Sequence, residues 1–263
     1  MKNERQVWYD ADRKIKVTMV DTSGAAQALA CGHLAGPTSA YFLSEALSVA
    51  GLLGEELSEE GETLSLQMKC SGPLGGYNVE CTRDGFLRGY TEKKVLDDFD
   101  GLVKQPISYS DVKRIVGDKC VQVTRSIPGK ILSQGVSTSI DSYLVSSLQR
   151  KAVVYTSAAV SDEVKVLSSR GLMIECLPDC TDFSPLYIKP KSLDVSPRSV
   201  LDELTLSRAE RKSSSSLQFG CRCSPERAAA TLAAFGEEER RTLPDSLDVT
   251  CHMCGRLFSV KVR

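Results

Sequence analysis

Four cysteines lie in two close pairs within the stretch FGCRCSPERAAATLAAFGEEERRTLPDSLDVTCHMCGRLF, residues 219–258. One pair is the C-x-C of Cys221 and Cys223, and the other is the C-x-x-C of Cys251 and Cys254. Structural zinc sites take four ligands from two such short-range pairs, which a longer stretch of chain brings together. The spacing therefore predicts one Zn²⁺ ion per chain, held by these four thiolates. An iron or iron–sulfur site fits two isolated pairs less well.

The residues between the two pairs favour a small fold around the metal. Ser224 is a good helix N-cap and Pro225 a good first helical residue, so we expect a helix that continues through 228–234 and stops at Gly236. A second short helix is expected in GEEERRTL. The runs LDVTC and RLFSVKV indicate two strands joined by CHMCG, in which Gly255 can adopt the left-handed backbone geometry of a metal-binding turn.

The C-terminal module, residues 220–263, is too short to bury a sufficient apolar core by itself. Structural zinc contributes roughly 10 to 16 kcal/mol in small zinc peptides at neutral pH, so the module is expected to unfold without the metal. The thiolates are also targets for peroxide or hypochlorous acid. A C-x-C disulfide closes a small, strained ring and should be easily reduced. Oxidation is therefore expected to release the metal and unfold the module.

Two histidines lie near cysteines and are possible further ligands. His252 lies inside the second pair, but four sulfurs already complete a tetrahedron. Cys31 and His33 form a C-x-H without a second pair nearby, so we expect a core thiol at Cys31 and a surface imidazole at His33.

The larger part of the chain, from about residue 14 to 178, has the pattern of an α+β fold with mostly antiparallel strands. Alternating apolar residues predict strands in 64–70, 77–81 and 86–90, which Gly- and Pro-containing turns would join into a meander. The turn sequence GPLGG also suggests a phosphate-binding loop, but no Gly-Lys-Ser/Thr follows, so a hairpin turn is favoured. The acidic run GEELSEEGE is expected to be a solvated loop.

Helices are expected to interrupt these strands. Ser39 can cap a helix that ends at Gly51 or Gly54, and a second helix should start at Ser139. KAVVYTSAAV and GLMIECLP then indicate two further strands.

Residues 179–219 differ in composition, with many serines and one short helical pattern around 199–210. Such a segment should bury little and be loosely ordered or marginally folded. We therefore expect three parts: a body of residues 1–178, a linker of residues 179–219, and the metal-binding module of residues 220–263.

Cys176 and Cys180 flank the start of this linker at a spacing that permits a bridge if the chain turns at Pro178. Spacing alone does not give the geometry of a disulfide, so two ordinary thiols are the favoured interpretation.

The overall charge argues against nucleic-acid and membrane partners. The formal net charge is −1, with 41% hydrophobic and 25% charged residues, values typical of globular proteins. The first residues lack the apolar stretch of a secretory signal, so we expect a cytoplasmic protein. In that reducing compartment the ten cysteines are expected to be thiols, metal ligands or redox groups.

Three phrases of the module, FGCRCSPER, FGEEE and VTCHMCG, closely resemble the zinc domain of the 33 kDa chaperonin family, redox-regulated heat-shock holdases. Residues 72–90, the SYLVSSLQ helix and GLMIECLP resemble the N-terminal domain of that family. The resemblance implies a chaperone that is not an enzyme and needs no ATP, that is inactive with zinc bound, and that is activated by oxidation and heat. It implies disulfides between Cys221 and Cys223 and between Cys251 and Cys254. It also implies that residues 1–178 bind unfolding clients and form a homodimer in the oxidised protein.

Two other functions remain open from the residues alone. A thiol oxidoreductase could use the C-x-x-C motif, but Cys254 precedes a strand-like run and not a helix that would lower its pKa. A zinc-ribbon nucleic-acid binder is suggested by cations in the module, which also offset the charge of a zinc tetrathiolate. These cations are Arg222, Arg227, Arg240, Arg241, Arg256, Lys261 and Arg263.

Overall fold

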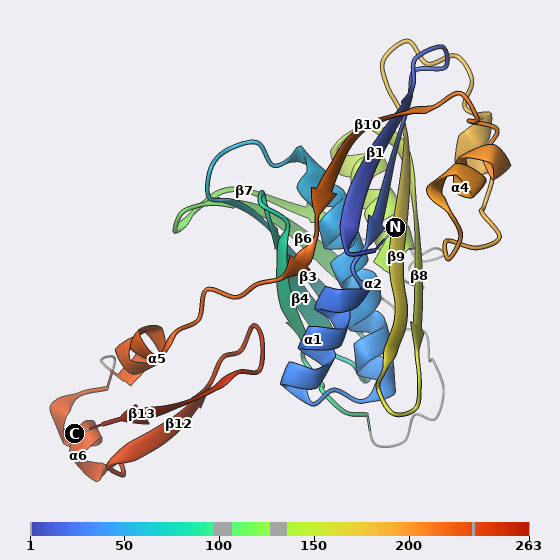
Figure 1. Ribbon diagram of the computed structural model, residues 1–263. Helices are drawn as coiled ribbons and strands as arrows, with labels where there is room; N and C mark the ends of the chain where they lie inside the picture. The colour runs from blue at the N-terminus through green and yellow to red at the C-terminus, as the bar shows by residue number, and fades with distance from the viewer. Residues whose placement is uncertain (1, 97–106, 127–135, 233–234, 263) are drawn as a thin grey trace.

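The computed structural model describes residues 2–96, 107–126, 136–232 and 235–262. Two large sheets enclose two helices, and a small module with a two-stranded sheet lies at the C-terminal end (Figure 1). This arrangement confirms the expected α+β class. Among the described residues, no helix is both long and apolar enough to cross a membrane.

The first sheet is antiparallel and has the strand order β10-β1-β2-β9-β8. Four of its strands come from the two ends of the body, and β10 comes from the segment 179–219. Strands β8 and β9 were predicted, whereas β1 and β2 were not. The strands are β1 (Glu4–Asp10), β2 (Ile15–Asp21), β8 (Lys151–Val160), β9 (Val166–Cys176) and β10 (Glu210–Ser216).

The second sheet has the order β11-β5-β4-β3-β6-β7, and its β3-β4-β5 part is the predicted meander. GPLGG forms the β3–β4 turn, in which the Gly75 N–H bonds to the Gly72 carbonyl and Gly75 has a φ of +76°. The hairpin-turn interpretation is therefore confirmed. The strands are β3 (Glu62–Cys70), β4 (Gly76–Thr82), β5 (Phe86–Thr91), β6 (Ile107–Val116), β7 (Lys119–Ser126) and β11 (Gln218–Phe219).

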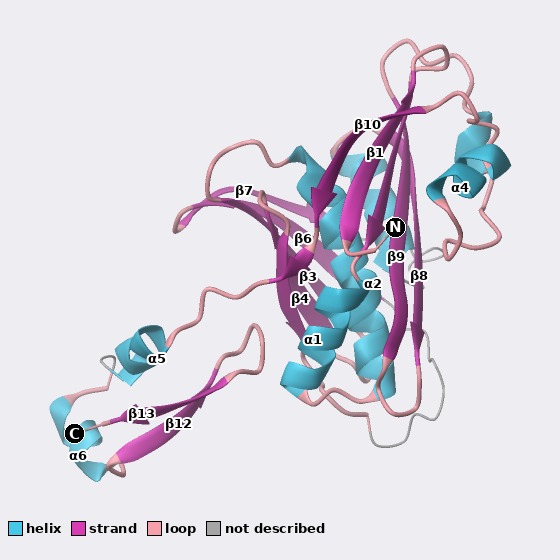
Figure 2. Ribbon diagram, viewed as in Figure 1, coloured by secondary structure: helices cyan, strands magenta, loops and turns pink. Residues whose placement is uncertain are grey.

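Helices α1 (Ser23–His33) and α2 (Pro37–Leu53) lie between the two sheets (Figure 2). Helix α2 packs against strands of both sheets, and almost all of its side chains are buried. The prediction that Ser39 caps this helix is wrong, because the helix starts after Gly36 with Pro37 at its first turn. The Ser39 hydroxyl instead donates to the Lys93 carbonyl. Helix α1 was not predicted.

The remaining body elements differ slightly from expectation. Helix α3 (Val136–Ser142) starts three residues before Ser139 and continues into the π-helical turn η2 (Tyr143–Ser147). The acidic run begins with the 3₁₀ turn η1 (Gly54–Glu56), and most of it is exposed as expected. Glu62 is the one buried acidic residue of this run, and it accepts the Ser58 and Glu59 N–H groups.

The serine-rich segment 179–219 is folded against the first sheet. After the 3₁₀ turn η3 (Ser184–Tyr187) and helix α4 (Pro197–Glu203), β10 pairs antiparallel with β1. The expectation that this segment buries little is wrong, because its apolar residues join a second core cluster around Trp8, Leu172 and Ile174. Its members from the segment are Val200, Leu201, Leu204, Leu206 and Ala209.

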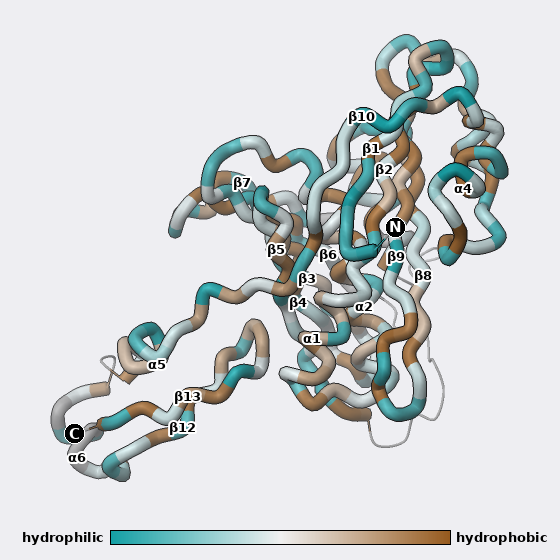
Figure 3. The backbone as a smooth tube through the Cα atoms, in the orientation of Figure 1, coloured by the Kyte–Doolittle hydropathy of each residue, from teal (hydrophilic) through white to brown (hydrophobic). Residues whose placement is uncertain are grey.

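Strand β10 shows how a polar segment can belong to a sheet. Its sequence ERKSSSS contains no hydrophobic residue (Figure 3). All seven of its side chains are exposed. Backbone hydrogen bonds to β1 hold it at the sheet edge, where a strand needs no apolar face.

Burial of Asp141 gives a testable pH dependence. Burial raises the pKa of this carboxyl to about 7, although the Val154 N–H donates to its Oδ1 at 2.6 Å. In the unfolded chain an aspartate titrates near about 3.9. Between these two values unfolding releases a proton, so stability falls as the pH rises through this window.

We expect Asp141→Asn, which keeps an acceptor for Val154, to stabilise the body above neutral pH by about 4 kcal/mol. The gain should vanish below about pH 4, where both states of the wild-type residue are protonated. Thermal unfolding followed by the fluorescence of Trp8 measures this, with the exposed Asp118→Asn as control. A gain that does not change with pH would contradict the assignment.

Candidate metal centre

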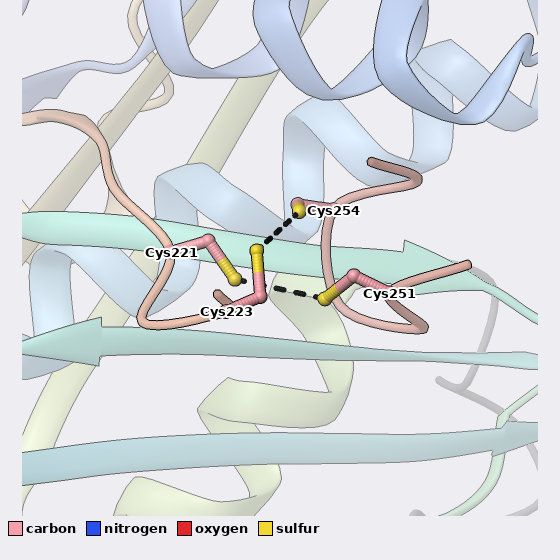
Figure 4. A group of neighbouring side chains, drawn as sticks. All are labelled: Cys221, Cys223, Cys251 and Cys254. Carbon is pink, nitrogen blue, oxygen red and sulfur yellow. Dashed lines mark hydrogen bonds between the residues drawn. The ribbon is translucent and has the colours of Figure 1, made fainter. Parts of the chain in front are cut away.

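The four predicted ligands converge on one point. The Sγ atoms of Cys221, Cys223, Cys251 and Cys254 all lie within 4.8 Å of one another (Figure 4). Cys221 Sγ is 3.8 Å from Cys251 Sγ, and Cys223 Sγ is 3.5 Å from Cys254 Sγ. A tetrahedron with zinc–sulfur bonds of about 2.3 Å has sulfur–sulfur edges of about 3.8 Å. All four are free thiols. The donor set and its spacing therefore fit Zn²⁺.

The two cysteine pairs lie in different local structures. The first pair follows β11, and the second lies on the turn between β12 (Ser246–Thr250) and β13 (Leu257–Lys261). There the Cys251 carbonyl accepts from the Gly255 N–H at 2.8 Å, and Gly255 has a φ of +74°. The left-handed geometry expected at Gly255 is therefore confirmed.

The helix predicted after the first pair is also present as α5 (Pro225–Leu232). Ser224 Oγ accepts the Arg227 N–H at 3.2 Å, which is the predicted capping interaction. The expected helix end around Ala234 lies outside the described residues. Helix α6 (Glu237–Thr242) corresponds to the second predicted helix.

The apolar core of the module is small. Only Ala228, Leu232 and Val260 form its buried centre among the described residues. Partly buried side chains, those of Leu247, Val249, Phe258 and Val262, pack around them. So little buried area supports the expectation that the fold of the module depends on the metal.

The turn that carries Cys251 and Cys254 packs directly on the body. Cys254 is buried and belongs to the main core cluster, together with residues of α1, α2 and both sheets. The Gly89 N–H of β5 donates to the Met253 carbonyl at 3.0 Å. A Cβ atom at Gly32 would overlap the Cys254 carbonyl oxygen, and one at Gly255 would overlap the Gly32 carbonyl oxygen. Helix α1 and the turn therefore meet backbone to backbone.

Arg88 of β5 links the body to the cysteine cluster. Its Nη1 lies 3.7 Å from Cys221 Sγ, while its Nε and Nη2 donate to Glu80 Oε2 at 2.7 and 2.6 Å. For the uncoordinated thiol, burial opposes ionisation of Cys221. The Cys223 N–H and Arg88 outweigh this effect and lower the pKa of Cys221 to about 7. Burial instead raises the pKa of Cys254. Arg88 and the Cys223 N–H therefore favour the thiolate form of Cys221, which is the form that binds a metal ion.

We expect Arg88→Ala to weaken zinc binding about 10–100-fold, because it removes a donor that stabilises the thiolate and orients it. Arg88→Lys retains the positive charge and should lose less. Competition with a coloured zinc chelator measures the affinity, and Arg83→Ala, which changes an exposed arginine next to β5, is the matched control. Unchanged zinc affinity in Arg88→Ala would show that the contact with Cys221 has no influence on the metal.

Neither histidine belongs to the cysteine cluster. The His252 ring contacts the Tyr90 ring at a centroid distance of 3.9 Å. The expectations for Cys31 and His33 are both wrong: Cys31 is exposed, and His33 is buried with Nε2 2.9 Å from the Gly89 carbonyl oxygen. The reason is the helical register of α1, which turns position 33 towards β5 and position 31 towards solvent.

The sequence prediction missed the partners that the body contributes to the site. Arg88, Gly89 and Gly32 lie more than a hundred residues before the cysteines, and no motif spacing joins them to the ligands. A contact between such distant segments is visible only in the folded chain.

Known proteins with similar sequences and structures point to one family. The family model described as "Hsp33 protein" matches residues 5–261. A 33 kDa chaperonin from Thermus thermophilus is 25% identical over 277 residues, covering 93% of this chain and 80% of that protein. One from Symbiobacterium thermophilum is 26% identical over 252 residues, covering 86% and 83%.

The fold is similar to a solved structure as well. The crystal structure of a 33 kDa chaperonin (heat shock protein 33 homolog) from Thermotoga maritima superposes with a TM-score of 0.84 at 16% identity. The similarity covers 100% of this chain and 96% of that one. With the family model matching nearly its whole length, the chain belongs to the Hsp33 protein family.

Proposed function

We propose that the protein is a redox-regulated, ATP-independent holdase of the cytoplasm, which binds unfolding proteins during oxidative stress. Membership in the Hsp33 family supports a chaperone role. The observation that carries the redox part is the cluster of four free thiols, within 4.8 Å of one another, on a module with little apolar core. Binding of clients, and not catalysis, is the proposed activity.

In the reduced state Cys221, Cys223, Cys251 and Cys254 would hold one Zn²⁺. When bound, the ion supplies the cross-link that joins the two ends of the module. The body supports this state through Arg88, which donates to Cys221, and through the Gly89 N–H, which donates to the Met253 carbonyl. With these contacts made, the segment 179–219 remains packed on the first sheet.

Oxidation would remove the ligands in pairs. We propose that Cys221 bonds to Cys223 and Cys251 to Cys254. In each pair two thiolates lose two electrons to one peroxide molecule, which takes up two protons and leaves as two waters. A disulfide sulfur is a poor ligand, so the module would lose its cross-link and unfold. The turn would then leave α1 and β5, and apolar surface of the body and linker would be free to bind clients, with a homodimer as the proposed active form.

The test combines two measurements on the full chain before and after treatment with peroxide at mild heat. One is zinc release, and the other is suppression of the aggregation of a chemically denatured client protein. Both should rise together and be reversed by a thiol reductant. Cys120→Ser, which changes an exposed cysteine of β7, is the matched control. Zinc release without any gain in suppression would disprove the proposed switch.

The thiol oxidoreductase alternative is less well supported. Cys254 is buried in the main core, and its C-x-x-C motif leads into β13 and not into a helix. A buried thiol with a raised pKa is a poor nucleophile. For a nucleic-acid binder, Arg88 and Arg222 lie next to the first cysteine pair, but Glu80 neutralises Arg88.

A further inference from the structure

Cys176 and Cys180, outside the metal centre, flank a tight turn at the end of β9. The Cys180 N–H bonds to the Leu177 carbonyl at 3.1 Å, and Asp179 has a φ of +68°. Pro178 followed by a residue with positive φ is the pattern of a type II β-turn. The Leu177 N–H bonds to the Lys14 carbonyl at 2.9 Å, which fixes the turn to the β1–β2 connection. The chain therefore does turn at Pro178, which was the condition for a bridge.

Both thiols occupy the same environment. Each is half-buried and packs against the core cluster around Trp8, Leu172 and Ile174. Both also line one cavity of about 330 Å³, whose other walls include Arg150, Lys151 and Phe183. A water molecule occupies about 30 Å³ of liquid volume, so an oxidant as small as hydrogen peroxide can reach the two sulfurs.

The two thiols also interact electrostatically. Burial is the main cause that raises the pKa of Cys176 to about 12, and a hydrogen bond between its thiol and that of Cys180 adds to the shift. Cys176 is thus protonated at neutral pH, which suits a resolving thiol more than an attacking one. The first attack on an oxidant is therefore assigned to Cys180.

We propose that Cys176 and Cys180 form a reversible disulfide under peroxide, as an oxidation site separate from the four metal ligands. The Cys180 thiolate attacks the O–O bond of hydrogen peroxide, which gives a sulfenic acid and hydroxide. The Cys176 sulfur then attacks the sulfenic sulfur; the S–S bond forms, and the hydroxyl leaves as water with the proton of the Cys176 thiol. One peroxide is reduced, and a thiol reductant restores both cysteines.

This bridge would tie the start of the segment 179–219 to β9. Beyond it, Asp182 pairs with Arg13 at 3.2 Å, and Lys151 lies 4.2 Å from the centre of the Phe183 ring. Both contacts are partly exposed single interactions and are weak. The disulfide would therefore hold the chain up to Cys180 on the first sheet when the rest of the segment 179–219 unfolds.

Peptide mapping of the full-length, zinc-loaded chain tests the proposal, because trypsin releases both cysteines in the single peptide 171–191. The chain is treated with hydrogen peroxide, its free thiols are alkylated, and the mass of the peptide is measured by mass spectrometry. We expect a fraction that is two hydrogen masses lighter than the reduced peptide and carries no alkyl group. Treatment with a reductant before alkylation should remove this fraction.

Two variants identify the roles of the sulfurs. Cys176→Ser should leave Cys180 as a sulfenic acid that a dimedone probe traps, whereas Cys180→Ser should give no such adduct at Cys176. Cys31 and Cys120, both exposed, serve as internal references for unpaired thiols. Full alkylation of both Cys176 and Cys180 after the references have been oxidised would overturn the proposal, and so would dimedone labelling at Cys176 alone. Zinc release is measured in the same samples. It reports on the four-cysteine cluster alone, so the absence of a Cys176–Cys180 disulfide can be told apart from failure of the proposed metal switch.

Discussion

Chelation of zinc from the reduced chain is expected to unfold residues 220–263 and to leave both large sheets folded. The metal contributes roughly 10 to 16 kcal/mol to comparable small zinc sites. The buried centre of the module, Ala228, Leu232 and Val260, cannot replace that contribution. The body retains two extensive core clusters that do not include these residues.

Hydrogen–deuterium exchange tests this prediction, because it measures the protection of each segment separately. Amides of β12 and β13 should exchange fully within seconds after chelation, while those of β3, β4 and β9 remain protected. Cys223→Ser, which removes one ligand, should give the same pattern without a chelator, and Cys120→Ser should not. A module that stays protected in the metal-free chain would show that the zinc site is dispensable for its fold.

Truncation of Leu204 to alanine is expected to release the segment 179–219 from the first sheet without any oxidant. Leu204 is fully buried in the cluster that joins this segment to β2 and β9. A leucine-to-alanine substitution in a packed core lowers the free energy of unfolding by about 2–5 kcal/mol. The polar strand β10 offers no apolar side chain that could compensate. The variant should therefore suppress client aggregation while it still retains zinc.

Leu167→Ala is the matched control, because it shortens the same kind of side chain at an exposed position of β9. Limited proteolysis should cut the Leu204→Ala chain between residues 190 and 216 and leave the control intact. If the variant is cut there but remains inactive towards clients, release of this segment is not sufficient for chaperone activity.

The cluster of four cysteines could be predicted from the sequence because the signals for it are local. Each cysteine pair spans four residues or fewer, and Ser224, Pro225 and Gly255 fix the adjacent turns through their own backbone preferences. The β3–β5 meander was predictable for the same reason, since alternation and glycine turns are short-range signals.

Features that depend on distant contacts could not be predicted. The serine run 213–216 has a composition typical of a linker, but β1 offers it backbone hydrogen-bonding partners, and composition does not record such partners. Likewise, whether Cys31 or His33 is buried depends on how α1 is rotated against β5. That rotation is set by Gly32, whose missing side chain admits the Cys254 carbonyl.

The contact between Gly32 and the Cys254–Gly255 peptide leaves no side chain between α1 and the sulfur-bearing turn. Close-packed backbone has low compressibility, so a displacement of α1 shifts the turn that carries Cys251 and Cys254 by a similar amount. Thermal loosening of α1 would therefore distort the arrangement of the sulfurs before any oxidant arrives. In the proposed switch, a rise in temperature and a change in redox state would both act on this contact between α1 and the turn, so the protein would respond to the two stresses together.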